Sequence, residues 1–326
     1  MKNHNAIFNI SSEKDFNSLA LAVFHYQYKN NAVYNSFCSL LNVNPNKVTS
    51  IEKIPFLPIS FFKTHAVKSG DFKEEIVFLS SGTTGETPSK HFVKDVNFYK
   101  ESFSRCFEQF YGTPSNLCIL ALLPSYLERE GSSLIYMTEA LIKASKHPKS
   151  GFYLHNLDEL VEQLTQLEAT NQSTLLIGVS FALLELAEKH TLNLTNTIIM
   201  ETGGMKGKRR ELTRDELHTF LTHKFGVNTI HSEYGMTELL SQAYSNGNGI
   251  YTPPNWMKII IRDVNDPFNL LPNQQTGGIN IIDLANIDSC AFIATQDLGK
   301  TINNNQFEVL GRFDNSDLRG CNLLIS

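Results

Sequence analysis

Short apolar runs that alternate with longer amphipathic stretches constrain the fold of this chain more than any other feature. Runs of strand length occur at 76–79, 118–122, 175–179, 198–201 and 227–230. The segments between them predict helices at 95–110, 132–146, 157–168, 181–190 and 213–224. Thr213 and Glu216 have the spacing of a capping box at the start of the last helix. Strands that alternate with helices predict an α/β core whose sheet is largely parallel.

The two ends of the chain have a different texture. Apolar residues recur every three or four positions across 12–42, which predicts one or two amphipathic helices. The stretch 54–59 cannot be helical, because each of its prolines lacks an amide donor and biases its predecessor toward extended geometry. After residue 250, shorter strands are predicted at 258–264, 278–284 and 307–310. We therefore expect one large domain over 1–326, with an α/β core at 1–250 and a β-rich subregion at 251–326.

Charge and cysteine content exclude several classes of protein. The net charge of −5 comes from dispersed side chains, so no nucleic-acid surface is expected. The five cysteines are widely spaced and contain no C-x-x-C pair, which argues against a disulfide framework or a zinc site. The N-terminus lacks the apolar stretch of a signal peptide, and no apolar run reaches the roughly 20 residues that a membrane span needs. A soluble cytoplasmic protein is expected.

A glycine- and hydroxyl-rich turn follows the first apolar run directly, at Ser80, Ser81, Gly82, Thr83, Thr84 and Gly85. Glycines let backbone N–H groups approach an anion, and the hydroxyls supply further donors, so this turn can cradle phosphate. It is not a Walker loop, because no Gly-Lys-Ser/Thr follows it. The alternative is an ordinary surface turn, since the same residue types favour turns.

A second segment with binding chemistry runs from Ser232 to Glu238. Tyr234 could stack on a purine, Thr237 could bond a phosphate oxygen, and Glu238 could hold a divalent cation. The alternative is a strand-to-helix turn in which Gly235 permits the bend, Thr237 caps the helix and Glu238 complements its dipole. Together with the glycine-rich turn, this segment indicates an enzyme that activates its substrate with ATP.

Three further segments complete a recognisable pattern: Glu201–Gly204, Thr295–Gly299 and Gly311–Asp314. In order and rough spacing, the five segments resemble the adenylate-forming superfamily of acyl- and aryl-CoA ligases, firefly luciferase and peptide-synthetase adenylation domains. The resemblance spans residues 78 to 320. It implies a layered α/β/α/β fold, with the nucleotide at the junction of the core and the β-rich subregion.

The resemblance also implies a role for each matching residue. Ser80–Gly85 and Lys90 would embrace the β- and γ-phosphates, and Tyr234, followed by Gly235, would stack on adenine. Thr237 would contact the α-phosphate and Glu238 would ligate Mg²⁺. Gly203 and Gly204 would line the adenine pocket, while Asp297 and Arg312 would hold the ribose hydroxyls. A carboxylate would attack the α-phosphorus to give an acyl-adenylate, a reaction that depends on positioning and charge neutralisation.

The chain departs from the superfamily pattern in three places. Lys90 lies two positions later than the usual lysine, and Gln296 stands where a glycine commonly precedes the aspartate. The chain stops at Ser326, whereas typical members continue for roughly another hundred residues as a mobile lid. We therefore expect no C-terminal lid domain.

In its short length and in three local stretches of sequence, the chain resembles one branch of the superfamily, the acyl-protein synthetases of bacterial bioluminescence. The matching stretches are 54–63, 201–206 and 318–322. This resemblance implies that a long-chain fatty acid is adenylated, transferred to Cys321 and passed to a reductase. Arg319 could activate that thiol. The alternative for Cys321 is a small apolar residue in a terminal strand.

The other cysteines and two aromatic side chains have more ordinary interpretations. Cys118 and Cys290 lie in apolar runs and are expected in the core, and Cys106 and Cys38 are expected to pack from helices. His231 could orient a substrate or be structural, and Tyr126 could line an acyl pocket.

Two rival functions remain open on the sequence. One is an acyl- or aryl-CoA ligase whose lid is a separate protein, and the other is a non-catalytic binding protein with the same fold.

Overall fold

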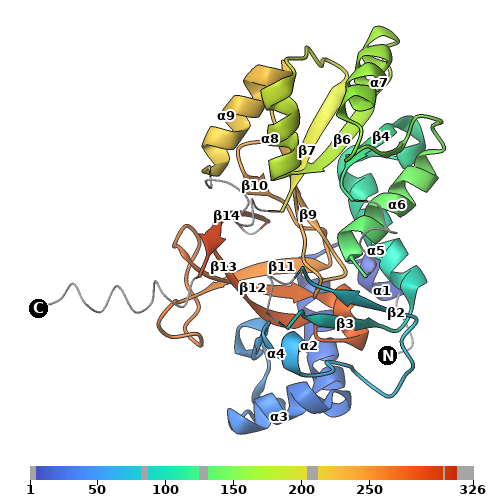
Figure 1. The fold of residues 1–326 in the computed structure, drawn as a ribbon. Coiled ribbons are helices and arrows are strands. Elements are labelled where there is room, and N and C mark those ends of the chain that lie inside the picture. The colour runs from blue at the N-terminus through green and yellow to red at the C-terminus, as the bar shows by residue number, and fades with distance from the viewer. Residues whose placement is uncertain (1–4, 82–86, 125–130, 204–211, 304, 314–326) are drawn as a thin grey trace, which may run out of the picture. The chain divides into compact units, whose positions relative to one another are not determined.

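The computed structural model describes residues 5–81, 87–124, 131–203, 212–303 and 305–313. The chain divides into two compact units. Unit 2 comprises Glu75–Pro88 and Asp95–Tyr251, and unit 1 comprises Met1–Glu74, Ser89–Lys94 and Thr252–Ser326. Both units contain sheets and helices (Figure 1), which confirms the predicted α/β class.

The sheet of unit 2 has the strand order β5-β4-β6-β7-β8-β9. Its first five strands are parallel, as the alternating pattern predicts, and β9 runs antiparallel to β8. The strands are β4 (Cys118–Leu122), β5 (Gly151–Phe152), β6 (Thr174–Val179), β7 (Thr197–Thr202), β8 (His231–Tyr234) and β9 (Ala243–Ser245). Strands β2 (Ile76–Leu79) and β10 (Ile250–Tyr251) also belong to unit 2.

The predicted strand at 227–230 is wrong, because the strand at this place is β8, four residues later. Residues 227–229 are half-buried or exposed, whereas Ser232, Glu233 and Tyr234 are buried and β8 pairs with β7. The strand was missed because its own residues are mostly polar. The first three residues of the second predicted binding segment, Ser232–Tyr234, therefore lie at the end of a sheet strand, and the rest of the segment follows it.

Among the described residues of unit 2, five helices accompany this sheet, within two residues of the predicted bounds. They are α5 (Val96–Tyr111), α6 (Ser133–Ser145), α7 (Leu157–Ala169), α8 (Ser180–Lys189) and α9 (Arg214–Phe225). Apolar side chains of α7, α8 and α9 form one core with β4, β6 and β7, and Figure 1 shows α8 beside α9. The predicted capping box is confirmed: Thr213 Oγ1 accepts from Glu216 N at 3.2 Å, and Thr213 N donates to Glu216 Oε2 at 2.8 Å.

Unit 1 is built on an antiparallel sheet with the order β14-β13-β12-β11. Its strands are β11 (Met257–Arg262), β12 (Gly277–Asp283), β13 (Phe292–Asn303) and β14 (Gln306–Arg312). The short β1 (Leu57–Pro58) pairs parallel to β13 and keeps 54–59 non-helical, as predicted. Strand β3 (Lys90–Val93) also belongs to this unit. Strand β13 was not predicted, because its second half is rich in polar residues and glycine, which hide a strand pattern.

The N-terminal part of unit 1 is helical, as predicted. Its helices are α1 (Asn5–Phe8), α2 (Glu13–Asn30), α3 (Ala32–Leu40) and α4 (Phe61–Thr64). Asn31 separates α2 from α3, and its side chain caps α3 by accepting from Tyr34 N at 2.9 Å. The 3₁₀ turns of this unit are η1 (Pro45–Lys47), η2 (Ile51–Lys53) and η4 (Leu284–Asp288), and η3 (Pro114–Asn116) belongs to unit 2.

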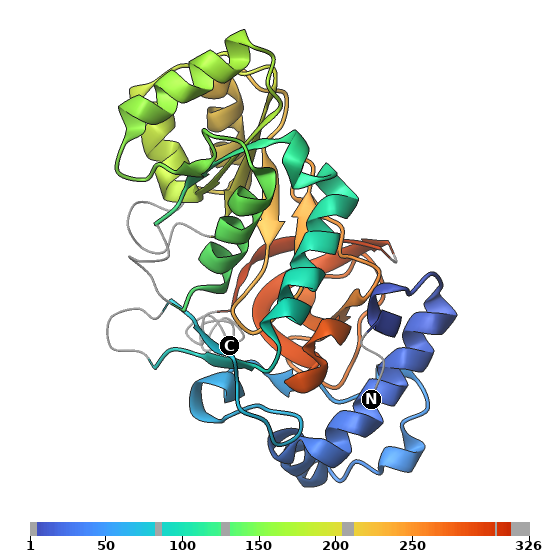
Figure 2. The ribbon, with the colours of Figure 1, turned by 90° about the vertical axis from the view of Figure 1, so that its right-hand side faces the viewer.

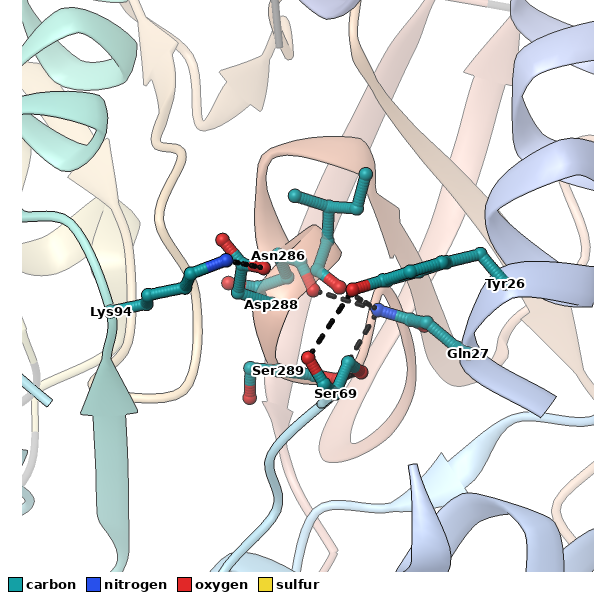
Figure 3. A network of polar contacts seen from close by, with 8 residues as sticks. Tyr26, Gln27, Ser69, Lys94, Asn286, Asp288 and Ser289 are labelled. Atoms are coloured by element: carbon teal, nitrogen blue, oxygen red, sulfur yellow. Dashed lines mark hydrogen bonds and ion pairs between the residues drawn. The ribbon is translucent and has the colours of Figure 1, made fainter. Parts of the chain in front are cut away.

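A buried amide joins α2 to the η4 turn that connects β12 to β13, and Figure 2 shows this helix beside the turn. Gln27 is fully buried, and its Nε2 donates to the carbonyl oxygens of Asn286 (2.9 Å) and Ile287 (3.0 Å). Figure 3 shows this network, in which Ser69 Oγ donates to Ser289 O and Lys94 Nζ lies 3.3 Å from Asp288 Oδ1. These contacts supply hydrogen-bond donors to carbonyl groups that lie between β12 and β13. They also fix the position of the chain just before β13 begins.

The four cysteines that the structure describes are all buried, which confirms the packing predicted for Cys38, Cys106, Cys118 and Cys290. No helix in the described part of the chain is long and apolar enough to cross a membrane.

Candidate nucleotide site

Two of the predicted segments meet at the carboxyl edge of the parallel sheet in unit 2. Strands β7 and β8 are parallel neighbours, and Thr202 pairs with Glu233. Gly203 therefore follows β7 where Tyr234 ends β8. In open α/β sheets, ligands bind outside the carboxyl ends of the strands, so this edge is the expected place for a nucleotide.

Gly203 has a conformation and surroundings suited to a binding edge. Its φ of +70° lies in the left-handed region, and a Cβ added there would meet no atom of the described residues within 4 Å. Its carbonyl oxygen accepts from Ser180 Oγ at 2.6 Å, and Glu201 Oε2 lies 3.1 Å from the same hydroxyl oxygen. Ser180 thus fixes both ends of the Glu201–Gly203 segment.

His218 is a second side chain directed at Glu201. Its Nε2 lies 3.6 Å from Glu201 Oε1, and both side chains are largely buried. Neither Ser180 nor His218 was predicted as part of the site, because each lies on a helix outside the Glu201–Gly204 segment. The only available signal was the position of Ser180 immediately after a predicted strand.

Tyr234 is 9% exposed and forms an aromatic pair with Tyr251. The two ring centroids are 5.8 Å apart, and the ring planes are inclined by 59°. The guanidinium carbon of Arg214 lies 5.4 Å from the centroid of Tyr251, within cation–π distance. Tyr251 was not predicted as part of the site, since an aromatic residue in a short strand carries no motif.

Glu233 is a buried acid beside the predicted purine site. Its Oε2 lies 2.5 Å from Thr202 Oγ1 in a buried hydrogen bond. Burial raises the pKa of Glu233 to about 7, and the nearby Glu201 carboxylate acts in the same direction. A Cβ added at Gly235 would collide with Glu233 Oε1, so glycine at this position lets the chain pass the buried carboxyl.

The strand-to-helix alternative for this segment is wrong, because the described residues between β8 and β9 form no helix. The chain turns after Tyr234, with Leu239 N donating to Met236 O at 3.1 Å, and it re-enters the sheet as β9. Thr237 therefore caps no helix. Glu238 is 6% exposed, which places a carboxylate in the turn between two sheet strands.

The glycine-rich turn is described only at its start. Ser80 is half-buried and Ser81 exposed, directly after β2. Leu79 N donates to Gly131 O at 2.7 Å, which joins the end of β2 to the segment that leads from β4 into α6. The predicted residues Gly82, Thr83, Thr84, Gly85, Gly204 and Cys321, together with Tyr126, lie outside the described residues.

Three predicted site residues belong to unit 1. Lys90 is exposed at the first position of β3. Asp297 and Arg312 are register partners on β13 and β14, and Asp297 Oδ1 lies 3.5 Å from Arg312 Nε. The Asp297 side chain is 13% exposed and that of Arg312 is 71% exposed. The structure thus brings together the two residues to which the resemblance gives the ribose hydroxyls.

His231 begins β8 and contacts a neighbouring phenol. Its Nδ1 lies 3.2 Å from Tyr111 Oη, and burial lowers the pKa of this imidazole. In the described part of the chain, no three His, Cys, Asp or Glu side chains form a group that could hold a metal ion.

This architecture is that of adenylate-forming ligases. A 2-hydroxyisobutyryl-CoA ligase in complex with 2-HIB-AMP and CoA superposes with a TM-score of 0.67 at 13% identity, covering 93% of this chain and 70% of that chain. ATP-bound MatB from Rhodopseudomonas palustris gives 0.55 at 18% identity, covering 76% of this chain and 49% of that chain. No curated protein matches the chain in sequence.

The chain belongs to the family described as acyl-protein synthetase, LuxE, whose family model matches residues 6–326. It is therefore an enzyme, an acyl-adenylate-forming ligase, and ligases of this class use ATP. Both the predicted resemblance and the predicted enzyme class are confirmed.

Proposed function

We propose that this protein uses ATP and Mg²⁺ to activate a long-chain fatty acid as its acyl-adenylate and then transfers the acyl group to its own Cys321. The family match over residues 6–326 is the observation that carries the proposal. We also propose that the protein is cytoplasmic and passes its acyl group to a partner reductase. The absence of disulfides among the four described cysteines supports a reducing compartment.

In this proposal, the carboxyl edge of the unit 2 sheet receives the nucleotide. Tyr234 stacks on adenine beside the open space at Gly203, and Ser80–Gly85 bind the β- and γ-phosphates with Lys90. Asp297 accepts hydrogen bonds from the ribose hydroxyls, and Arg312 donates to them. Their pairing at 3.5 Å supports a shared role.

Glu238 and Thr237 fit a magnesium–phosphate site. Mg²⁺ prefers hard oxygen ligands and is usually held by one or two carboxylates together with substrate phosphates. Glu238 supplies a largely buried carboxylate, and Thr237 supplies a neighbouring hydroxyl for the α-phosphate. Bound Mg²⁺ would neutralise charge on the phosphates while the fatty carboxylate attacks the α-phosphorus and pyrophosphate leaves.

The state of the other cysteines supports Cys321 as the acceptor. Burial raises the pKa of the Cys38 and Cys290 thiols to about 12, and it also raises the pKa of Cys118. Cys106 is fully buried, and its thiol donates to Gln242 O at 3.2 Å. Because the thiolate is the nucleophile, these four positions are poor acyl acceptors at neutral pH.

Labelling separates the proposal from its alternatives. The protein is incubated with ATP, Mg²⁺ and radiolabelled tetradecanoate and then run on a denaturing gel. We expect label on the wild type and on the buried-thiol control Cys38→Ser, but not on Cys321→Ser. Fatty-acid-dependent exchange of pyrophosphate into ATP should persist in all three proteins.

Equal label on Cys321→Ser would remove this residue as the acceptor. Exchange without label, together with acyl-CoA formation when CoA is added, would favour a CoA ligase instead. CoA is bound in the structure of the 2-hydroxyisobutyryl-CoA ligase, which makes that alternative specific.

A further inference from the structure

Arg262 is a buried cation in unit 1 to which the sequence gives no role. It is the last residue of β11 and is 9% exposed. Its Nη1 donates to Ile279 O at 2.7 Å and to Asn280 Oδ1 at 2.8 Å, and its Nη2 donates to Thr295 O at 2.6 Å. All three acceptors are uncharged. Burying a guanidinium against neutral acceptors is costly, so a specific role for it is expected.

The guanidinium reaches into an irregularity between β12 and β13. Gly278 pairs with Leu298 and Asn280 pairs with Ala294, so only Ile279 stands opposite Thr295, Gln296 and Asp297. This is a β-bulge in β13, a device that often redirects a side chain next to an active site. Arg262 donates to carbonyl groups on both sides of the bulge, at Ile279 and Thr295.

The Thr295 hydroxyl extends this bracing to Asp297. Thr295 Oγ1 donates to Ile279 O at 2.9 Å, the same carbonyl oxygen that Arg262 contacts. It also accepts from Asp297 N at 3.1 Å. A continuous set of hydrogen bonds therefore runs from the Arg262 fork through Thr295 to the backbone of Asp297.

A second connection leads from Arg262 to the residue after Arg312. The guanidinium carbon lies 5.5 Å from the ring centroid of Phe313. Phe313 N donates to Gln296 O at 2.8 Å, within the bulge. Arg262 thus contacts a residue close in sequence to Asp297, which is Thr295, and the residue next to Arg312, which is Phe313.

The neighbouring strand is shaped to admit a guanidinium. A Cβ on Gly278 would lie 2.6 Å from Arg262 Cζ, so only glycine leaves room for the side chain to cross the sheet. Burial lowers the pKa of Arg262 to about 10, while the Asp297 charge acts in the opposite direction, so the side chain stays charged at neutral pH. A lysine at this position would keep the positive charge. It would lack the planar guanidinium whose N–H groups bond all three acceptors at once.

We infer that Arg262 is the positioning residue of the ribose site, which holds the β13 bulge so that Asp297 and Arg312 present their side chains to the ribose hydroxyls. This inference rests on the proposed ribose role of Asp297 and Arg312.

The test compares ATP with 2′,3′-dideoxy-ATP in fatty-acid-dependent pyrophosphate exchange. In Arg262→Lys, kcat/KM for ATP should fall about three- to tenfold, the effect of about one hydrogen bond. The value for the dideoxy nucleotide should change little, because that nucleotide lacks the hydroxyls. The preference for ATP should fall to a similar extent in Asp297→Asn, and the double variant should lose no more than Asp297→Asn alone.

Two further variants separate an effect on ribose binding from a general loss of folded protein. Thr295→Val is nearly isosteric and should reduce the preference for ATP in the same direction. Lys258→Met is the matched control: it removes another β11 cation, whose Nζ lies 2.7 Å from Glu13 Oε1, and it should leave the preference unchanged.

An equal loss for both nucleotides in Arg262→Lys, or no loss for either, would overturn the inference. If Asp297→Asn still reduced the preference, the ribose site itself would stand. An unchanged preference in Asp297→Asn would overturn the ribose assignment and the inference together.

Discussion

The surroundings of the Glu233 carboxyl favour its protonated form over its ionised form. It is 7% exposed, its hydrogen-bonding partner is the Thr202 hydroxyl, and the nearby carboxylate of Glu201 opposes a second negative charge. Its pKa of about 7 in the folded protein lies well above the ordinary value of 4.5. The folded state therefore binds more protons at this site than the unfolded state between these two values.

This difference predicts a pH-dependent stability. Below pH 4.5 the carboxyl is protonated in both states and costs nothing, whereas between about pH 4.5 and 7 the unfolded state alone gains from ionisation. Stability should fall over this window by an amount on the order of a few kcal/mol. In Glu233→Gln, which cannot ionise, urea unfolding at pH 5 and pH 7.5 should show a markedly smaller fall. Identical pH profiles for the two proteins would contradict the assigned pKa.

The ring of Tyr234 gives a second prediction at the residue scale. In Tyr234→Ala the KM for ATP should rise about ten- to a hundredfold, because stacking on a base contributes roughly 1–3 kcal/mol. Tyr234→Phe keeps the ring and should stay near the wild-type value. If both variants behaved alike, either unchanged or equally impaired, the stacking role would be wrong.

At the scale of single elements, α9 is the next element after β7 in the described part of the chain. Its capping box satisfies the first amides of the helix through Thr213 and Glu216. Thr213→Ala should destabilise the protein by about 1 kcal/mol in thermal or urea unfolding. Thr219→Ala, an exposed change in the middle of the same helix, is the control and should cost nothing, because alanine is the better helix former. Equal effects of the two changes would exclude a specific cap.

Elements with strong apolar periodicity were predictable from the sequence, and elements specified by tertiary contacts were not. Strands β4 and β6 are continuous apolar runs, and their position was predicted within one residue. Strand β8 was misplaced because Ser232 and Glu233 are polar residues that the fold buries. Strand β13 was missed because its second half is rich in polar residues and glycine, and its bulge is held by Arg262, which is distant in sequence.

The candidate site shows the same division. Asp297 and Arg312 were identified by motif, and the structure pairs them. Ser180, His218 and Arg262 contact the predicted segments or their neighbours in ways that leave no local pattern, so they could be found only with coordinates.

At the scale of the whole molecule, we expect two classes of cysteine that differ in how fast they react with a thiol reagent. The four that the structure describes are buried, so in the folded protein they should react slowly with a thiol reagent such as dithionitrobenzoate. We predict one fast-reacting thiol in the native protein and its loss in Cys321→Ser, with all remaining thiols reacting after denaturation. A fast phase that persists in Cys321→Ser would contradict the proposed division.

The central claim is that Ser80–Gly85 and Tyr234–Glu238 surround a single ATP. The most direct measurement is a crystal structure of the protein with Mg²⁺ and a non-hydrolysable ATP analogue such as α,β-methylene-ATP, which keeps all three phosphates. The account predicts adenine on Tyr234, with both segments in contact with the one nucleotide. A nucleotide that contacts only one segment, or that binds elsewhere on the protein, would contradict it.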